Sequence, residues 1–379
     1  MDKISKLPDE LIAKVLTFLP TKEAVSTSIL SKRWEHLWMW LPKLEYDDQH
    51  YSESERKRLR CFIVRSLPLH KAHVIESLRL KLSNSHYFKP QVIKWIVATA
   101  VSRKYVSWIS LTMITPEFLD DWILLAVCLP SLRTLQLQQV AYFNEEYLQR
   151  LLSNCPALEE LKVDIWVDDN TRKFTITVPS LQRLSLFIPF DYGIDGLVIK
   201  TPSLKYFKLR VHSSSNHYCL VEHMPNLIEA YLDVEFPNIK SLIESITSVK
   251  CLEICSERGW PGGVERASAS IRTRVRTAGQ AIGDAHFDGT IFRQLEQLKV
   301  CTCETTEWLD LLMRLLKAAP KLRFIVLELS KFHGIRTGDP ILAGTNRVVF
   351  LNDCCLLLNI LTGGNTEEQK KRNKWQDTS

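Results

Sequence analysis

The chain has 379 residues, 45% hydrophobic and 24% charged, which is the composition of an ordinary globular protein long enough for more than one folding unit. This composition excludes wholesale disorder, and no run of eighteen apolar residues is present that would cross a membrane. The formal net charge of +6 is modest for this length and is not gathered on one helical face. The charge therefore gives no argument for nucleic-acid binding.

Ten cysteines are scattered mostly inside or beside apolar stretches. The chain opens on a helical pattern and not on a basic and then apolar leader, so we expect an intracellular protein, in the nucleus, the cytoplasm or both, with reduced thiols. We interpret the cysteines as small buried hydrophobes. The pairs Cys301/Cys303 and Cys354/Cys355 lack the two-residue spacing and the matching second pair of a zinc site, so we expect no metal and no other cofactor.

Residues 1–45 have the pattern of three short helices. Pro8 suits a first helical turn, and the two acids that follow it favour a helix N-terminus. An apolar stripe then recurs at helical spacing until Pro20 ends it. Thr21 is the predicted cap of a second helix, and Ser31 is the predicted cap of a third. So small a bundle buries little apolar surface of its own, and a partner is expected to cover the rest.

The same segment resembles an F-box, on a set of residues that runs through all three predicted helices. These residues are Leu7-Pro8, Leu16, Leu19-Pro20, Ser26, Leu30-Ser31, Arg33-Trp34 and Leu37-Trp38. The resemblance implies docking on a Skp-type adaptor, and through it on the cullin and RING subunits of a ubiquitin ligase. The adaptor-facing residues that it implies are Leu7, Pro8, Leu11, Ile12, Leu16, Leu19, Leu30 and Trp34. For Leu16, Leu30 and Trp34, packing inside the bundle is an equally good interpretation.

The middle of the chain repeats the unit Pro-x-Leu-x-x-Leu-x-Leu. Its prolines are Pro130, Pro156, Pro179, Pro202 and Pro225, so the spacing settles at 23 residues, which is typical of leucine-rich repeats. Weaker copies extend the pattern to both sides, from Ile75 to Leu327. Leu-x-Leu places both leucines on one face of a short strand, and one unit cannot cover that face alone. We therefore predict an α/β fold in which an N-terminal three-helix F-box is followed by a leucine-rich-repeat solenoid with a curved parallel sheet.

Helices are expected between some strands of the solenoid, at 144–152 and 308–316, whereas the units between 164 and 250 are shorter and more β-like. A solenoid offers a long surface for binding. Polar residues alternate with the buried leucines, and for any one of them a merely solvated strand face is an equally good interpretation. The candidate target-binding residues are Arg133, Gln136, Glu160, Lys162, Arg183, Lys205 and Lys208.

One segment, 257–287, breaks the repeat, because arginines such as Arg274 and Arg276 stand where a strand needs apolar residues. We expect this segment to be a disordered insertion. The repeats on either side of it, led by Val249 and Leu295, would then stack directly on each other. An acidic partner or a nucleic acid is the alternative interpretation of its arginines. The repeats are assigned to 70–334, and an irregular tail with a single apolar stretch, Val348 to Leu361, to 335–379.

An F-box followed by such repeats is similar to the plant F-box/LRR proteins of the FBD group. Residues 292–334 resemble the first half of the FBD region, through Pro320-Lys321-Leu322-Arg323 and His333-Gly334. The tryptophan- and proline-containing closing half is not recognisable.

No nucleotide-binding loop, nucleophile elbow or histidine-rich metal motif appears in the sequence, so no catalytic residue is expected. The leading hypothesis is a non-catalytic substrate-recognition subunit of an SCF-type (Skp-cullin-F-box) ubiquitin ligase, which binds a target protein of unknown identity and no membrane. Two alternatives remain open. One is a ligand-sensing F-box/LRR receptor, and the other is a non-ligase scaffold or a decayed family member.

Overall fold

The computed structural model describes residues 6–82, 106–113, 128–140, 145–165, 173–188, 196–211, 218–234, 240–255, 291–303, 307–330 and 345–351. The chain divides into two compact units, Met1–Leu204 and Lys205–Ser379, and each is described by itself.

Unit 1 begins with a helical bundle made of α1 (Asp9–Leu16), α2 (Thr21–Ser26) and two 3-10 helices, η2 (Thr27–Ile29) and η3 (Trp34–Trp40). Pro8 stands at the start of α1 as predicted, although as its N-cap residue, and Pro20, which was predicted to end the first helical run, is the N-cap residue of α2. At the end of both helices a side-chain hydroxyl donates a hydrogen bond to a backbone carbonyl, as Thr17 does to the Lys14 carbonyl at 2.7 Å. The third predicted helix is present as the 3-10 helix η3.

Both predicted side-chain caps are wrong. Thr21 is the first residue of α2, and its hydroxyl instead accepts the Glu45 N–H at 2.8 Å, which ties α2 to the next strand. Arg33 is the N-cap of η3, and no side-chain capping bond is made there. The bundle is therefore held by its core, which consists of Ile12, Leu16, Ala24, Trp38 and Leu41.

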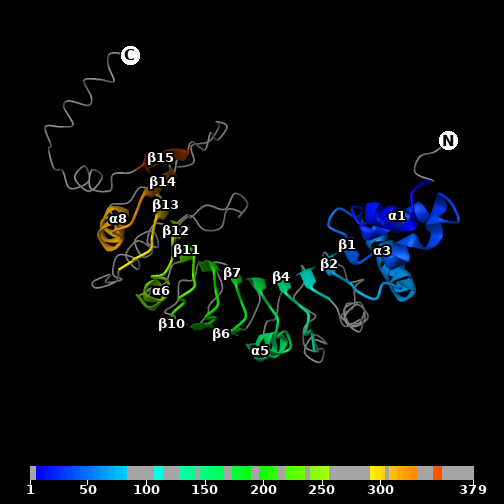
Figure 1. The fold of residues 1–379 in the computed structure, drawn as a ribbon, viewed down its shortest axis with the longest axis horizontal. Coiled ribbons are helices and arrows are strands. Elements are labelled where there is room, and N and C mark those ends of the chain that lie inside the picture. The colour runs from blue at the N-terminus through cyan, green and yellow to red at the C-terminus, as the bar shows by residue number, and fades with distance from the viewer. Residues whose placement is uncertain are drawn as a thin grey trace, which may run out of the picture. The chain divides into compact units, whose positions relative to one another are not determined.

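The bundle is joined to the repeats by β1 (Lys43–Asp47), α3 (Glu53–Ser66) and the 3-10 helix η4 (Leu67–Leu69), as Figure 1 shows. A capping box starts α3, in which the Glu55 carboxylate accepts the Ser52 N–H at 2.8 Å and the Ser52 hydroxyl at 2.7 Å. α2 contacts β1, so the bundle covers the first strand of the sheet, whose edge would otherwise offer unpaired backbone groups.

The sheet of unit 1 continues with β2 (Ser77–Leu82), β3 (Trp108–Met113), β4 (Thr134–Val140), β5 (Glu160–Ile165) and β7 (Arg183–Ile188). These strands pair in parallel in the order β1-β2-β3-β4-β5-β7. The register aligns equivalent apolar residues, which are fully buried in one row: Leu78, Ile109, Leu135, Leu161 and Leu184. The predicted one-strand-per-repeat solenoid is confirmed.

The repeated proline has a definite geometric role. Leu132 donates its N–H to the Leu129 carbonyl at 3.2 Å, so that Pro130 is the second residue of a turn, where its fixed φ is favourable. The same turn recurs before Leu158, Leu181, Leu204 and Leu227. Most repeats are also bonded to the next through one carbonyl that accepts two N–H groups. Arg133, for example, accepts those of Glu159 and Glu160, both at 2.8 Å.

The segments between the sheet strands of unit 1 contain α5 (Glu145–Ser153) and two short strands, β6 (Lys173–Thr177) and β8 (Gly196–Lys200), which pair in parallel. The expected helix at 144–152 is therefore confirmed. The expected β-like character of the shorter repeats is confirmed too, because a strand replaces the helix there.

Unit 2 has the same design. β9 (Tyr206–Val211), β11 (Glu229–Val234), β12 (Cys251–Cys255), β13 (Gln297–Cys303) and β14 (Phe324–Ser330) pair in parallel, in that order. Between them lie β10 (Tyr218–Val221), α6 (Lys240–Ser245) and α8 (Glu307–Ala318), which confirms the helix expected at 308–316. Unit 2 has its own row of aligned buried apolar residues, Phe207, Ala230, Leu252, Leu298 and Ile325.

Two features of unit 2 bear on the predicted segments. β12 pairs directly with β13, Leu252 opposite Leu298, so the repeats led by Val249 and Leu295 are neighbours in the sheet, whereas the predicted insertion 257–287 lies outside the described residues. Within the tail predicted to be irregular, β15 (Thr345–Leu351) is a strand and pairs antiparallel with β14. The β-branched and aromatic residues Val348, Val349 and Phe350 favour a strand, and an antiparallel return needs no crossover helix. The rest of 335–379 lies outside the described residues.

Candidate functional site

The helical bundle leaves a cluster of large apolar side chains in contact with solvent. Phe18, Ile29 and Leu30 expose 81%, 87% and 65% of their surface, and Leu11, Val15 and Leu19 expose between 37% and 51%. We call these six residues the bundle apolar face: Leu11, Val15, Phe18, Leu19, Ile29 and Leu30. Leu11, Val15, Phe18 and Leu19 recur at helical spacing on one side of α1 and the turn after it, and exposed apolar residues grouped in this way are typical of an interaction surface.

The eight predicted adaptor-facing residues divide into three groups. Leu11, Leu19 and Leu30 are exposed on the bundle apolar face, and Pro8 is exposed at the start of α1. Leu7 and Trp34 are half-buried against the core. Ile12 and Leu16 are each only 1% exposed, so their side chains pack inside the bundle and are not available to a partner.

The sequence interpretation missed Val15, Phe18 and Ile29. The signal was present in the width of the apolar pattern. Successive helical residues are about 100° apart, so adjacent apolar pairs such as Leu11 with Ile12 cannot share one narrow stripe. α1 therefore has two apolar sides, one buried in the bundle and one facing solvent.

A polar tether fixes the start of α1 relative to η3. The Arg33 guanidinium donates to Asp9 Oδ1 at 2.6 Å and also to the Leu7 carbonyl. Both ionic partners are partly exposed, so their pairing contributes no more than about 1 kcal/mol. Its role is to orient the helix that carries Leu11, Val15 and Phe18.

The second candidate surface is the set of strand residues that alternate with the buried leucines in unit 1, which we call the outward strand face. On β1 and β2 it carries two ion pairs, Glu45–Arg79 at 3.0 Å and Asp47–Lys81 at 3.1 Å. On the next strands the residues in line with Arg79 are Ser110, Gln136, Lys162 and Ser185. This row is polar, and Lys162 is its one charged member beyond β2.

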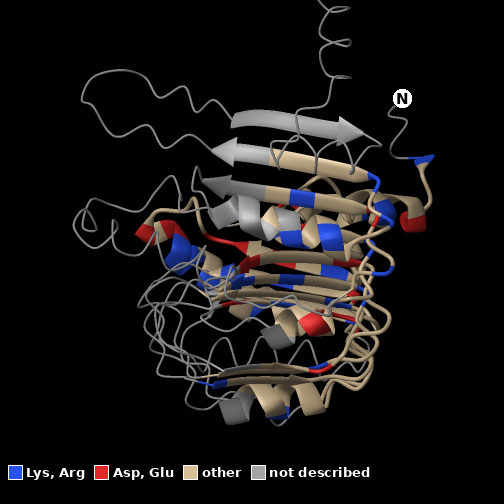
Figure 2. Ribbon diagram, turned by 90° about the vertical axis from the view of Figure 1, so that its left-hand side faces the viewer, with Lys and Arg blue, Asp and Glu red and all other residues tan. Residues whose placement is uncertain are grey.

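The outward strand face has a counterpart in unit 2, where charged side chains also pair with one another. Figure 2 marks basic and acidic positions along the strands. The Lys208 ammonium lies 4.4 Å from the ring centre of Tyr231, and Arg210 pairs with Asp233 at 3.3 Å. Glu253 pairs with Lys299 at 2.7 Å. Burial raises the pKa of Tyr231 well above its ordinary value, and Cys255 and Asp233 act in the same direction. Tyr231 is therefore an uncharged ring beneath a cation at neutral pH.

The predicted target-binding residues fall on this outward strand face and at its edge. Gln136, Lys162 and Lys208 each lie between the two buried apolar residues of their strands, and Glu160 is the register partner of Arg183. Arg133 and Lys205 precede their strands, where their carbonyls link neighbouring repeats. All seven are at least partly exposed. They belong to two units, Lys205 and Lys208 to the second.

The cysteines differ from the expectation of small buried hydrophobes. Cys155 and Cys255 are buried, and burial raises the pKa of Cys155 to about 12, but Cys61 and Cys128 are exposed. Cys61 is exposed because the apolar stretch containing it is the C-terminal half of the amphipathic helix α3, whose inward side is taken by Leu59 and Ile63. Among the described residues, no group of three or more acidic, histidine or cysteine side chains is arranged to hold a metal, and no helix is long and apolar enough to span a membrane.

A helical bundle with an uncovered apolar face, followed by repeats with one parallel strand each, defines an F-box protein with leucine-rich repeats. The F-box domain family matches residues 4–46, and the family described as the LRR repeats of FBD-associated F-box protein At5g56370 matches residues 75–239.

Similar proteins occur in Arabidopsis thaliana. FBD-associated F-box protein At4g10400 is 46% identical over 350 residues, which cover 86% of this chain and 77% of that protein. F-box protein At4g09920 is 50% identical over 282 residues, or 68% of this chain and 88% of that protein. Putative F-box/LRR-repeat protein At4g15060 is 43% identical over 373 residues, or 90% of this chain and 82% of that protein. The chain belongs to this family of F-box/LRR-repeat proteins with FBD-associated members.

Proposed function

We propose that this protein is the non-catalytic substrate-recognition subunit of an SCF-type ubiquitin ligase, acting in the nucleus, the cytoplasm or both. The bundle apolar face would bind a Skp-type adaptor and, through it, the cullin and RING subunits. The outward strand face would bind the target protein. The observation that carries the proposal is the exposure of Phe18, Ile29 and Leu30 on an F-box bundle.

The energetics favour an apolar partner at the bundle. Burying one large apolar side chain contributes about 1.5–3 kcal/mol relative to leaving it exposed. Six such side chains form the bundle apolar face, and α1 presents four of them at or just beyond its length. A helix-lined apolar surface on the partner would therefore supply enough free energy for stable association, after the cost of ordering both partners.

The chemistry of ubiquitin transfer would belong to other subunits. The names of the relatives above state no enzymatic activity. The contribution of this chain would be proximity, because holding a target near a charged transferase converts a bimolecular encounter into an effectively intramolecular step.

Adaptor binding is the primary test. The double variant Phe18→Ala/Leu30→Ala should lower affinity for a recombinant Skp-type adaptor at least about 100-fold, because each truncation removes roughly 1.5–3 kcal/mol of apolar burial. Its thermal unfolding should match that of the wild type, since both side chains are exposed. The control is Leu220→Ala, in the repeats, where the leucine is 54% exposed against 65% for Leu30, and this variant should bind the adaptor normally.

Full adaptor binding by the double variant would contradict the assigned surface. Failure of the wild-type chain to bind any Skp-type adaptor would instead favour the non-ligase scaffold.

Target capture is the second test. Affinity capture from plant extract, with and without proteasome inhibition, should recover proteins that accumulate only when degradation is blocked. Substituting Lys162→Glu on the outward strand face should reduce their recovery, whereas the same change at Lys14, on the exposed side of α1, should not alter target capture by the repeats. Equal capture by wild type and Lys162→Glu would place the target elsewhere on the chain.

A further inference from the structure

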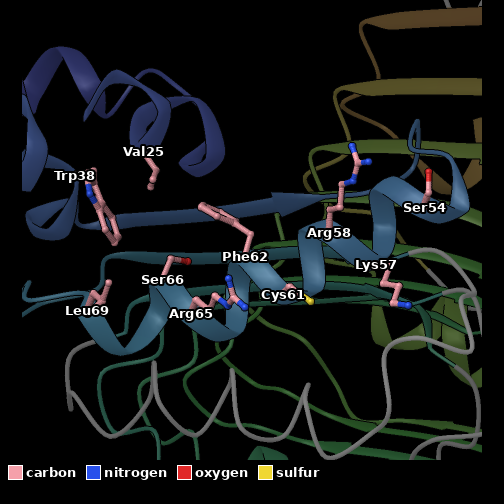
Figure 3. A pocket seen from close by; sticks show the side chains of 10 residues that line it. All are labelled: Val25, Trp38, Ser54, Lys57, Arg58, Cys61, Phe62, Arg65, Ser66 and Leu69. Atoms are coloured by element: carbon pink, nitrogen blue, oxygen red, sulfur yellow. The ribbon is translucent and has the colours of Figure 1, made fainter. Parts of the chain in front are cut away.

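A groove of about 680 Å³ lies between α3 and the helical bundle (Figure 3). Its lining residues on α3 and η4 recur at helical spacing from Ser54 to Leu69, so they form one continuous side of this helix, and Val25 and Trp38 contribute from the bundle. None of the residues of the bundle apolar face lines it. The groove is therefore a separate feature of unit 1, with a volume in the ordinary range for ligand pockets, roughly 300–1,000 Å³.

One part of the groove is apolar. Val25, Trp38, Phe62 and Leu69 line it, and Leu69 is 52% exposed although it neighbours the buried Leu67. The Trp38 ring is held by a 3.1 Å bond from its Nε1 to the Glu35 carbonyl, and the Phe62 ring packs edge-on against Tyr46, with ring centres 6.4 Å apart. These apolar walls are therefore fixed in position before any ligand arrives.

Three other lining side chains are positively charged. Lys57, Arg58 and Arg65 line the groove and are exposed, and no carboxylate lines it. α3 carries five basic residues against two acidic ones, and both acids lie in its first turn. Arg58 acts on the Glu55 carboxylate, one of several effects that hold the pKa of this carboxyl below its usual value, after the hydrogen bonds from Ser52. Within the described residues, Lys57 and Arg65 form no ion pair.

A buried hydroxyl completes the lining. Ser66 is 4% exposed and lies beside the buried Tyr46 phenol, whose pKa is raised by burial against the opposing effect of its hydrogen bond with Ser66. Apart from this contact, the Ser66 hydroxyl has no hydrogen-bond partner in the part of the chain that the structure describes. A hydroxyl can donate once and accept twice, so Ser66 retains capacity for a polar atom in the groove.

We propose that this groove binds a soluble amphipathic anion, a molecule with an apolar body and a carboxylate head group. Figure 3 shows Trp38 and Leu69 toward one end of the row and Ser54, Lys57 and Arg58 toward the other. The apolar body lies along Trp38, Phe62 and Leu69, and the carboxylate lies toward the end that carries Lys57 and Arg58, whose side chains leave α3 in different directions and make this end electropositive. Arg65 covers the body with its aliphatic stem and keeps its guanidinium in solvent.

The combination selects this class of ligand for a physical reason. An uncharged apolar molecule would gain nothing from the positive charge at one end of the groove, and an inorganic anion would gain nothing from the apolar walls. Only a ligand that carries both features satisfies both parts of the lining. The proposal does not depend on adaptor or target binding, because the residues involved differ.

Cys61 supplies a direct readout, since it is an exposed free cysteine that lines the groove. Full-length protein is treated with N-ethylmaleimide, and the alkylation rate of Cys61 is followed by peptide mass spectrometry, with and without decanoate below its micellar concentration. Saturating decanoate should slow alkylation of Cys61 at least tenfold. Cys128, which is also exposed but does not line the groove, should react at an unchanged rate.

Ligands with the same apolar chain and other head groups test whether the negative charge is required. Decanol and decyltrimethylammonium carry the same apolar chain without the anion, and each should protect Cys61 at least tenfold less well than decanoate. The double variant Lys57→Gln/Arg58→Gln should raise the decanoate concentration for half-protection at least tenfold. Arg60→Gln removes the same kind of charge from the same helix outside the groove, so it should leave that concentration unchanged.

Several outcomes would overturn the proposal: no protection of Cys61 by decanoate, equal protection by decanol, or an equal loss in Arg60→Gln. Protection by phosphatidylglycerol vesicles or by an acidic amphipathic peptide, without protection by decanoate, would overturn it in favour of a membrane surface or a protein partner. Adaptor binding measured on the same samples separates these results from those for the proposed ligase function.

Discussion

The bundle apolar face and the outward strand face differ in the kind of side chain that they expose to water. The first presents Phe18, Ile29 and Leu30 to water with little polar compensation. The second presents charged side chains that largely satisfy one another, such as Glu45 with Arg79 and Glu253 with Lys299. Covering the first surface with a partner lowers the free energy, because apolar area leaves water. The charged groups of the second surface are already paired or hydrated, so covering them brings little gain.

This difference indicates what each surface can recognise. An apolar face binds any partner of complementary shape and suits one constant partner, because apolar burial is non-directional. A paired polar face binds only a partner that can replace its ion pairs and hydrogen bonds, so it rejects most surfaces. One chain thereby combines a general attachment surface with a selective one. The predictions below test this contrast, beginning with the scaffold that both surfaces share.

The largest effect is expected inside the repeats. Leu184→Ala should lower the free energy of unfolding by about 2–5 kcal/mol, because the side chain is fully buried and its loss leaves a cavity. Ser185→Ala, the next residue on β7 and part of the outward strand face, should change it by less than about 0.5 kcal/mol. Urea unfolding of the two variants measures the difference. A larger loss in Ser185→Ala would mean that the strand register is shifted by one residue.

A second contrast lies within one helix. Ile12→Ala should lower the free energy of unfolding by about 2–5 kcal/mol, because Ile12 is in the bundle core. Leu11→Ala, at the adjacent exposed position, should leave unfolding nearly unchanged and weaken adaptor binding by about 1.5–2 kcal/mol, or roughly 10- to 30-fold. Calorimetry of binding, together with thermal melts, separates the two effects. If both variants only destabilise the fold, Leu11 is a core residue and the two-sided view of α1 is wrong.

A third contrast compares two ion pairs on the repeats. Arg210→Ala should cost about 1–3 kcal/mol of unfolding free energy, because the Asp233 side chain is 3% exposed and loses a charged partner in a desolvated place. Arg133→Ala should cost less than about 1 kcal/mol, since Arg133 and Glu159 are 64% and 40% exposed. Equal losses of unfolding free energy in urea would show that the burial of an ion pair does not determine its contribution to stability.

The repeats were predictable from sequence because one physical requirement recurs at a fixed spacing. Each unit needs a turn and two inward side chains, and Pro130 with Leu135 and Leu137 meets both needs locally. The expected helices at 144–152 and 308–316 followed from the same periodic reasoning and are present as α5 and α8. Register needed no tertiary information, because the leucine spacing alone specifies the inward face.

The parts that were not predictable depend on contacts distant in sequence. Thr21 caps no helix, because its hydroxyl is taken by the backbone of Glu45, which is far along the chain. Ile12 and Leu11 are both apolar, and only the packing of α1 on Trp38 and Leu41 shows which one is buried. The groove beside α3 could not be predicted, because it forms where Val25 and Trp38 of the bundle approach Phe62. β15 was not predicted, because it pairs antiparallel with β14 and does not carry the repeat motif.

The smallest expected effect concerns the start of α3, the helix between the two surfaces. The Glu55 carboxylate accepts two hydrogen bonds from Ser52, and these lower its pKa in the folded state. A carboxyl with a lowered pKa in the folded state stabilises the fold above its unfolded pKa, and this contribution is lost as the pH falls through the folded pKa. Glu55→Ala should therefore be less stable than the wild type at pH 7, and urea unfolding at a series of lower pH values should show this difference in unfolding free energy becoming smaller.

The control variant is Glu55→Gln, which keeps an acceptor for the Ser52 N–H but does not titrate in this range. Its difference in unfolding free energy from Glu55→Ala should stay constant with pH. A gap between wild type and Glu55→Ala that is unchanged at acid pH would mean that the capping box, and not the charge, fixes the helix against which the bundle packs.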